Sequence, residues 1–258
     1  MIDLAHTTQN RLLNMLEATN LNAFFAQFEL VYLPQDEVLF ESGQQFAYSY
    51  FPISAVISTV FQSSLNCWLE TEAIRNDGMF GLPSSIDNQL VTSAVVQSAG
   101  HAYRIETKIL EKELKRSDEL LQVLLKFLQL RITKIAQIAV CTRFHSIEQQ
   151  LSRILLHVLD CSPTSTLMIT QQTIAEKLNV RRESITQHSG SLLNKGIIAR
   201  TRGKITILNR AALEKATCEC YHLIANETDR LLKCNTKLAY NRMAITTLTS
   251  NDLEYLYH

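Results

Sequence analysis

Hydrophobic residues change their spacing along the chain, and these changes divide it into segments of different predicted structure. Between residues 9 and 28, apolar side chains recur at helical spacing, which predicts one or two short helices. From Val31 to about residue 107, short runs rich in β-branched and aromatic residues alternate with turn signals such as Gly43 and Asp77-Gly78. Several short strands at near-regular spacing predict a small antiparallel roll or jelly roll.

The helical period returns after Ile105 and is strongest over residues 119–142, a segment without Gly or Pro that is apolar on more than one side. One apolar stripe suffices to pack a helix on its own roll. A second stripe indicates a partner helix, most simply the same helix of another subunit. A helix that only fills a core is the alternative. We predict dimerisation through Leu121, Leu125, Leu128, Ile132 and Ile135.

A further amphipathic helix is predicted over residues 147–159, and a break at Pro163 then leads into a C-terminal domain. Residues 209–233 also show a helical pattern. The predicted class is α+β. The expected divisions are a β-roll with N-terminal helices at 1–118, a dimerisation helix at 119–145, a DNA-binding domain at 146–233 and a tail of unknown role at 234–258.

The charges are distributed unevenly over a chain whose formal net charge is zero. Residues 1–118 carry 7 Lys or Arg against 14 Asp or Glu, a net of −7. Residues 151–215 carry 10 against 4, a net of +6. A basic segment attached to an acidic body indicates an anionic partner for that segment, although a merely solvated basic face is the alternative.

Composition and motifs exclude several classes of protein. No apolar run approaches the roughly 18 to 20 residues that span a bilayer, and the N-terminus shows no secretory pattern, so we expect a cytoplasmic protein without membrane contact. The motifs GxSxG, P-loop and HExxH are absent. A cupin-like metal enzyme needs several histidines in its roll, and residues 30–107 contain only His101. An enzyme is therefore not expected.

The six cysteines, at positions 67, 141, 161, 218, 220 and 234, include no CxxC pair. In a cytoplasmic chain we expect them to be reduced, buried thiols. Cys218 and Cys220 would point to different sides if their segment were helical. We therefore predict no metal site and no cofactor.

The stretch that begins at Thr170 and includes residues 173–196 has the spacing of a helix-turn-helix, with Thr170 as the N-cap of the first helix. Asn179 lies at the turn, where a left-handed backbone is needed. The inward-facing positions are Ile174, Ala175, Leu178, Ile185 and Leu192. In this motif the first residues of the second helix meet base edges in the major groove. The predicted base-reading residues are Arg181, Arg182, Glu183, Ser184 and Gln187.

The segment IIARTRGKITIL, residues 197–208, has the pattern of strand, tight basic turn and strand, which is a wing. The predicted contacts to the DNA backbone are Thr170, Gln171, Arg200, Arg202 and Lys204. Two features of the second helix depart from the usual pattern. His188 occupies a position that is usually apolar, and Gly190 weakens a helix interior by about 1 kcal/mol relative to Ala.

These segments together resemble the Crp–Fnr superfamily of bacterial transcription regulators. MITQQTIAEKLNV and the wing resemble its DNA-binding domain, and LPQDEVLFESGQ, YFPISAVIS, RNDGMFGLP and AVVQSAGHAYRI resemble its cyclic-nucleotide-binding-type roll. The resemblance covers roughly residues 20–233. It implies a homodimer that binds a near-palindromic site on double-stranded DNA, with RNA polymerase as a further candidate partner. A winged helix that contacts protein rather than DNA is the alternative function.

The effector cassette departs from that family pattern. Where cyclic-AMP-binding members have Gly-Glu-x-Gly, this chain has Gly78-Met79-Phe80-Gly81, and the later Arg-Ser pair is Thr92-Ser93. Without the arginine, a buried cyclic phosphate would lose its charge-assisted bonds. We therefore predict no cyclic-nucleotide binding. Oxygen-sensing members bind an iron–sulfur cluster through cysteines near the N-terminus, whereas the first cysteine of this chain is Cys67. For a haem sensor, His101 and Cys67 would be the candidate axial ligands. The effector is unknown or absent.

Overall fold

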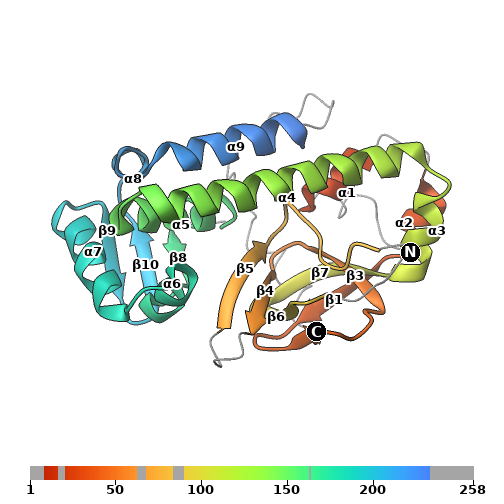
Figure 1. Cartoon of the computed structure of the whole chain (residues 1–258), viewed down its shortest axis with the longest axis horizontal. Helices are drawn as coiled ribbons and strands as arrows, with labels where there is room; N and C mark the ends of the chain where they lie inside the picture. Colours follow the sequence, from red (N-terminus) through yellow and green to blue (C-terminus); the bar gives the residue numbers. More distant parts are fainter. Residues whose placement is uncertain (1–8, 17–20, 63–67, 84–89, 163, 233–258) are drawn as a thin grey trace, which may run out of the picture.

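The computed structural model describes residues 9–16, 21–62, 68–83, 90–162 and 164–232. The fold is α+β, as the sequence predicts. Helix α4 (Asp118–Phe144) runs along the molecule, with the β-roll against its N-terminal half and a small winged domain at its C-terminal end (Figure 1). Helix α9 (Glu219–Leu231) packs along α4. None of the helices in the described part of the chain combines the length and the apolar character that a membrane span requires.

Two antiparallel sheets form the roll. One has the strand order β1–β7–β3 and the other β2–β6–β4–β5. Their bounds are β1 Glu29–Leu33, β2 Val38–Phe40, β3 Tyr48–Pro52, β4 Val56–Gln62, β5 Trp68–Ile74, β6 Ser93–Ser98 and β7 Gly100–Glu106. Three phenyl rings lie in the core of the roll, with centroids 5.7 Å apart for Phe40–Phe46, 6.0 Å for Phe40–Phe80 and 6.1 Å for Phe46–Phe80.

The segment RNDGMFGLP, expected among the β-rich runs, contains only an isolated bridge, between Phe80 and Tyr50. The two residues exchange both backbone hydrogen bonds at 2.9 Å. A turn precedes the bridge, in which the Gly78 amide donates to the carbonyl of Arg75 at 3.0 Å. The turn and Gly81, with φ of 80°, leave too short an extended stretch for a strand.

Short helices close one end of the roll, namely α1 (Arg11–Leu16), α2 (Asn22–Phe25) and α3 (Thr107–Leu114). The buried amide of Asn10 joins α1 to the roll. Its Nδ2 donates to the carbonyls of Pro52 (2.8 Å) and Gly78 (3.0 Å), and its Oδ1 accepts from the backbone amides of Leu12 (3.0 Å) and Leu13 (3.3 Å) in α1. All hydrogen-bonding groups of this buried side chain are therefore satisfied, which keeps its burial from destabilising the fold.

Ser117 is the N-cap of helix α4: its hydroxyl accepts a hydrogen bond from the Leu120 amide at 3.2 Å. Its core-facing side chains are Leu120, Val123, Leu124, Phe127 and Leu130. The side chains of a second apolar stripe are exposed in the single chain, namely Leu121, Leu125, Ile132 and Ile135. Leu128, the fifth residue of the predicted dimer set, is half-buried.

The winged domain is built from helices α5 to α8 and a three-stranded sheet of order β8–β10–β9. The bounds are α5 Ile147–Asp160, β8 Thr166–Leu167, α6 Gln171–Leu178, α7 Arg182–Asn194, β9 Ile198–Thr201, β10 Lys204–Ile207 and α8 Arg210–Ala216. The wing is present where the sequence predicts it, with Gly203 at its tip in a left-handed conformation, φ 75°. Strand β8 was not predicted, because two residues carry too little pattern to recognise.

The predicted helix over residues 209–233 is interrupted, which corrects the expectation for the cysteines. Thr217 and Cys218 have extended backbones, with ψ of 170° and 168°, and Cys218 is the N-cap of α9. Because Cys218 lies outside the helix, helical geometry does not set the direction of its side chain. Cys218 and Cys220 do not point apart; both reach Cys141 in one buried cluster. Cys161 is exposed rather than buried, and positions 67 and 234 lie outside the described residues.

Partly buried ion pairs join the roll to the rest of the chain. Lys134 of α4 contacts Asp77 at 2.5 Å, and Lys177 of α6 contacts Glu70 of β5. Burial alone would raise the pKa of Asp77, but the charge of Lys134 and its hydrogen bond outweigh burial and lower that pKa to about 2. The carboxylate therefore stays ionised at neutral pH and keeps its partner.

Replacing Gly190 by alanine is expected to stabilise the protein by about 1 kcal/mol. Gly190 lies inside α7, and a Cβ built there meets no atom within 4 Å beyond its chain neighbours and the nearby backbone of its own helix, so only the helix propensity changes. Urea unfolding followed by circular dichroism measures the effect. Gly100→Ala is the matched control, because its Cβ would lie 2.4 Å from the backbone nitrogen of Ala55 and should destabilise by about 1 to 3 kcal/mol. Equal stability of Gly190→Ala and the parent would contradict the expectation.

Candidate nucleic-acid interface

The turn between α6 and α7 has the predicted geometry. Thr170 caps α6 by accepting a hydrogen bond from the Thr173 amide at 3.0 Å. Asn179 ends the helix with φ 51° and ψ 46°, the left-handed conformation that asparagine tolerates better than most residues. Arg181 is extended, and α7 begins at Arg182. The second helix therefore starts directly after the turn, with two arginines at its beginning.

The inner and outer faces of the motif also follow the prediction. The residues expected to face inward are all buried, namely Ile174, Ala175, Leu178, Ile185 and Leu192. Of the predicted base-reading residues, Ser184 is half-buried and the others are exposed, namely Arg181, Arg182, Glu183 and Gln187. The N-terminal part of α7 therefore presents its polar side chains to solvent, where a ligand can reach them.

A polar network that the sequence analysis did not predict ties the motif to the wing. The buried hydroxyl of Ser189 in α7 accepts hydrogen bonds from Gln171 Nε2 at 2.9 Å and from Arg200 Nη1 at 3.0 Å. Thr186 donates to Gln171 Oε1 at 3.2 Å. Ser189 lies four residues after Ile185 and therefore on the same inward-facing stripe of the helix. A small polar residue at a position where an apolar one is expected was the sequence signal that could have predicted this buried hydrogen-bond network. The network fixes α6, α7 and β9 relative to one another.

The three elements enclose a groove of about 630 Å³. Predicted DNA-contacting residues from α6, α7 and the wing line it together: Thr170, Gln171, Arg182, Arg200, Arg202 and Lys204. The fold therefore brings Arg182, expected to read bases, beside the cations expected to contact phosphates. The remaining base-reading candidates lie outside this lining, namely Arg181, Glu183, Ser184 and Gln187.

The electrostatics of the groove differ from those of the surface around it. None of the described residues that line it is acidic. No ion pair within the described chain neutralises its cations, Arg182, Arg200, Arg202 and Lys204. Elsewhere in the domain Lys195 pairs with Glu148 at 2.6 Å and Arg210 with Asp160 at 2.7 Å. The groove thus concentrates uncompensated positive charge and suits a polyanion.

The residues of the altered effector cassette do not surround an open site in the described part of the roll. Met79 is fully buried in the core beneath α4. Gly81 lies where a Cβ would be 2.8 Å from the carbonyl oxygen of Tyr48. Thr92 and Ser93 are half-buried, and the Ser93 hydroxyl accepts a hydrogen bond from the Ser42 amide at 3.1 Å. The segment 84–89 between the two halves of the cassette lies outside the described residues.

Comparison with known proteins agrees with this geometry. A family model described as the Crp-like helix-turn-helix domain matches residues 149–216. No curated protein sequence matches the chain. Among solved structures, FixK2 from Bradyrhizobium japonicum superposes with a TM-score of 0.66 at 13% identity, over 74% of this chain and 98% of its own.

Two further structures show the same fold. TTHB099, a transcriptional regulator of the CRP family from Thermus thermophilus, has a TM-score of 0.62 at 16% identity, over 72% of this chain and 95% of its own. The c-di-GMP responsive global regulator CLP of Xanthomonas campestris has a TM-score of 0.56 at 16% identity, over 71% and 95%. The chain therefore has the Crp–Fnr fold and carries a Crp-like helix-turn-helix domain at residues 149–216.

Proposed function

We propose that this protein is a sequence-specific, DNA-binding transcription regulator that acts as a homodimer. The groove between the helix-turn-helix and the wing supports this function best, because four cations that form no ion pair within the described chain line it, and none of its described lining residues is acidic. Helix α7 would enter the major groove, and the wing would lie along the phosphate backbone. Phosphate contacts would position the domain and base contacts would supply the sequence preference.

The side chains divide between these two roles by their positions. Arg181, Arg182, Glu183, Ser184 and Gln187, at the start of α7, are the proposed base-reading residues. Thr170, Gln171, Arg200, Arg202 and Lys204 are the proposed backbone contacts. We assign residues 1–118 to the roll, 119–145 to the dimerisation helix and 146–233 to the DNA-binding domain.

A homodimer is supported by the exposed stripe of α4. Ile132 is 68% exposed and Ile135 50% exposed, one turn of helix apart, and Leu121 and Leu125 continue the same stripe toward the N-terminus. Apolar side chains repeated at this spacing pack well against an identical helix related by a two-fold axis. Such a dimer would present two copies of α7 to successive major grooves, which requires a near-palindromic site.

Control by cyclic AMP is not part of this proposal. A cyclic nucleotide in the roll needs a cation for its phosphate and a carboxylate for its ribose, and the matching positions hold Thr92 and Met79. The Met79 side chain is buried among apolar neighbours, and three phenyl rings pack inside the roll. Both observations favour a roll whose described interior serves as a packed core.

The dependence of DNA affinity on salt tests the proposal. The three proposed backbone cations per protomer, Arg200, Arg202 and Lys204, make six per dimer, so log K for random duplex DNA should fall against log salt with a slope of about −5 if each contacts a phosphate. Replacing Arg202 and Lys204 by glutamine removes four of these six contacts and should reduce the slope by about two thirds.

Lys195→Gln is the matched control, because Lys195 is already paired with Glu148 and lies outside the groove lining. It should leave the slope unchanged. Absence of binding to any duplex at low salt would overturn the DNA-binding function and favour a winged helix that contacts a protein partner.

A further inference from the structure

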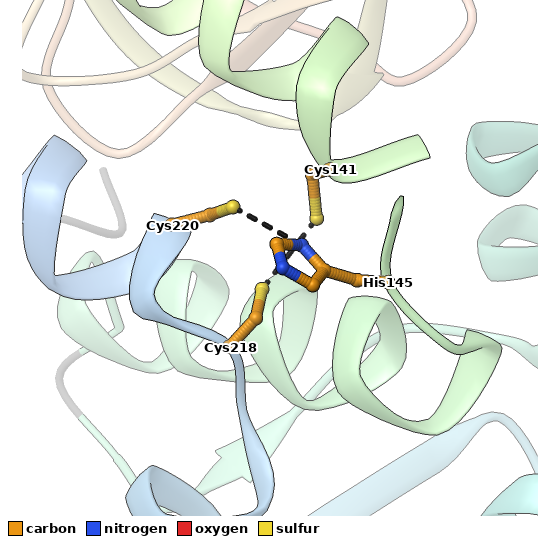
Figure 2. Close-up of side chains that lie close together, drawn as sticks. All are labelled: Cys141, His145, Cys218 and Cys220. Atoms are coloured by element: carbon orange, nitrogen blue, oxygen red, sulfur yellow. Dashed lines mark hydrogen bonds between the residues drawn. The ribbon is translucent and has the colours of Figure 1, made fainter. Parts of the chain in front are cut away.

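Four side chains with metal-binding atoms meet at the junction between α4, α5 and α9. Cys141 lies in the last turn of α4, and His145 is the residue that ends it. Cys218 caps the N-terminus of α9, and Cys220 lies in its first turn. The three Sγ atoms and a ring nitrogen all lie within 4.8 Å of one another (Figure 2). The three cysteines are buried, and His145 is half-buried.

The separations already approach those of a tetrahedral site. The Sγ atoms of Cys141 and Cys218 are 3.6 Å apart, and Cys220 Sγ lies 3.3 Å from His145 Nδ1. The ligand atoms of a zinc ion with ordinary Zn–S and Zn–N bonds lie about 3.5 to 3.8 Å from one another. The four groups therefore need only small movements to share one ion.

The orientation of His145 suits metal ligation. Its Nε2 lies 3.1 Å from a carboxylate oxygen of Glu219, while Nδ1 faces the thiols. A proton on Nε2, donated to Glu219, leaves the lone pair of Nδ1 directed into the cluster. A carboxylate that holds the far nitrogen of a ligating histidine is the usual outer partner in zinc sites.

The surroundings also match a cluster of thiolates. Gln137 Nε2 donates a hydrogen bond to Cys220 Sγ at 3.1 Å. The guanidinium of Arg153 places a positive charge near Cys141, is buried, and its Nε has no hydrogen-bond partner within the described chain. Three thiolates, a neutral imidazole and a divalent ion carry a net charge of −1, which this buried cation balances.

We infer that Cys141, His145, Cys218 and Cys220 form a structural zinc site that closes the junction of the long helix with the DNA-binding domain. Thiolate and imidazole ligands select zinc over magnesium or calcium, and four protein ligands complete its coordination without an open position. Zinc binding here does not depend on DNA binding, because the ligands all lie outside the groove.

The location gives the ion a mechanical role. His145 directly precedes Ser146, the capping residue from which α5 and the winged domain begin. Helix α9 returns from that domain and packs along α4. An ion bound by both α4 and α9 would therefore fix the orientation of the winged domain relative to α4. Removal of the ion would allow that orientation to vary.

Metal analysis of the full chain, purified without chelator, tests the inference. Inductively coupled plasma mass spectrometry should find one zinc per chain in the parent protein and no zinc in Cys141→Ala. Cys161→Ser is the matched control, since Cys161 is an exposed cysteine outside the cluster, and it should retain the zinc. Full zinc in Cys141→Ala, or no zinc in the parent even after incubation with the ion, would overturn the site.

Titration of the parent chain with Co²⁺ tests the same zinc site without a substitution, so its result does not depend on whether a variant folds. Co²⁺ should bind with the intense visible bands of tetrahedral coordination and the near-ultraviolet bands of thiolate ligands, and zinc should displace it. Glu219→Gln keeps all four ligands but replaces the carboxylate that accepts the hydrogen bond of His145 by a neutral amide. The affinity for zinc, measured by competition with a chelator, should therefore fall about 10- to 100-fold.

Three results would contradict a mononuclear zinc site. One is a weak, octahedral cobalt spectrum. Another is a disulfide between Cys141 and Cys218, detected as a mass lower by two hydrogens, in protein kept under reducing conditions. The third is iron with acid-labile sulfide at the same cysteines, which would assign them to an iron–sulfur cluster instead.

Discussion

If the protein is the homodimer proposed above, Ile132→Glu is expected to convert it into monomers. In the proposed seam the two copies of Ile132 approach the two-fold axis, so the substitution would bury two facing carboxylates and cost several kcal/mol. In the single chain the side chain is 68% exposed, so the monomer itself should keep its fold. Sedimentation velocity measures the mass, and thermal unfolding by circular dichroism checks that the subunit is intact.

The same variant should lose DNA affinity by a factor of about 100 or more, because a monomer can no longer bind two half-sites at once. Lys126→Glu is the control. Lys126 is also exposed on α4, but it lies about 120° around the helix from Ile132. It should remain dimeric despite a larger change in charge. A dimer that persists in Ile132→Glu would show that the subunits meet elsewhere.

Arg182→Ala is expected to weaken binding to the preferred operator by about 1 to 3 kcal/mol and to relax the preference at one base pair. Arg182 is the first residue of α7, exposed and without an acidic partner in the described chain. Its guanidinium can donate two hydrogen bonds to O6 and N7 of a guanine. Competition binding against operators altered one base pair at a time measures both effects, once selection from random duplexes has given the operator.

Arg202→Ala supplies the contrast, because Arg202 lies beside Gly203 at the tip of the wing. It should weaken binding to all sequences by a similar factor and reduce the salt dependence. Arg182 shares a groove with this arginine, so the alternative for Arg182 is a phosphate contact. Uniform loss on all sequences in Arg182→Ala would assign it to that role.

The sequence predicted the helix-turn-helix in detail because its determinants are local. Thr170 caps a helix through the amide three residues later, and Asn179 adopts the left-handed conformation at the turn. The inward positions follow from the helical period alone. The long helix and the wing were likewise predicted, since each depends on spacing within about thirty residues. By contrast, strand β8 and the break between α8 and α9 carry too little local pattern.

Contacts between distant segments needed the tertiary structure. Gln171, Ser189 and Arg200 come from three elements, and their shared hydrogen bonds depend on how those elements pack. The partly buried pair of Lys177 and Glu70 joins residues 107 positions apart. No spacing rule connects such residues, because the path of the chain between them decides whether they meet.

The sequence by itself determined the order of parts in this protein: a roll, a long helix with two apolar stripes, and a winged helix-turn-helix with a basic wing. Propensity, capping and hydrophobic period act within a few turns, so these features are readable without a fold. Only the tertiary structure decided that one stripe of α4 stays uncovered in the single chain, and that Cys141 and His145 meet Cys218 and Cys220. The meeting of these four residues depends on the packing of α9 against α4, across more than seventy residues of intervening chain, where local pattern carries no information.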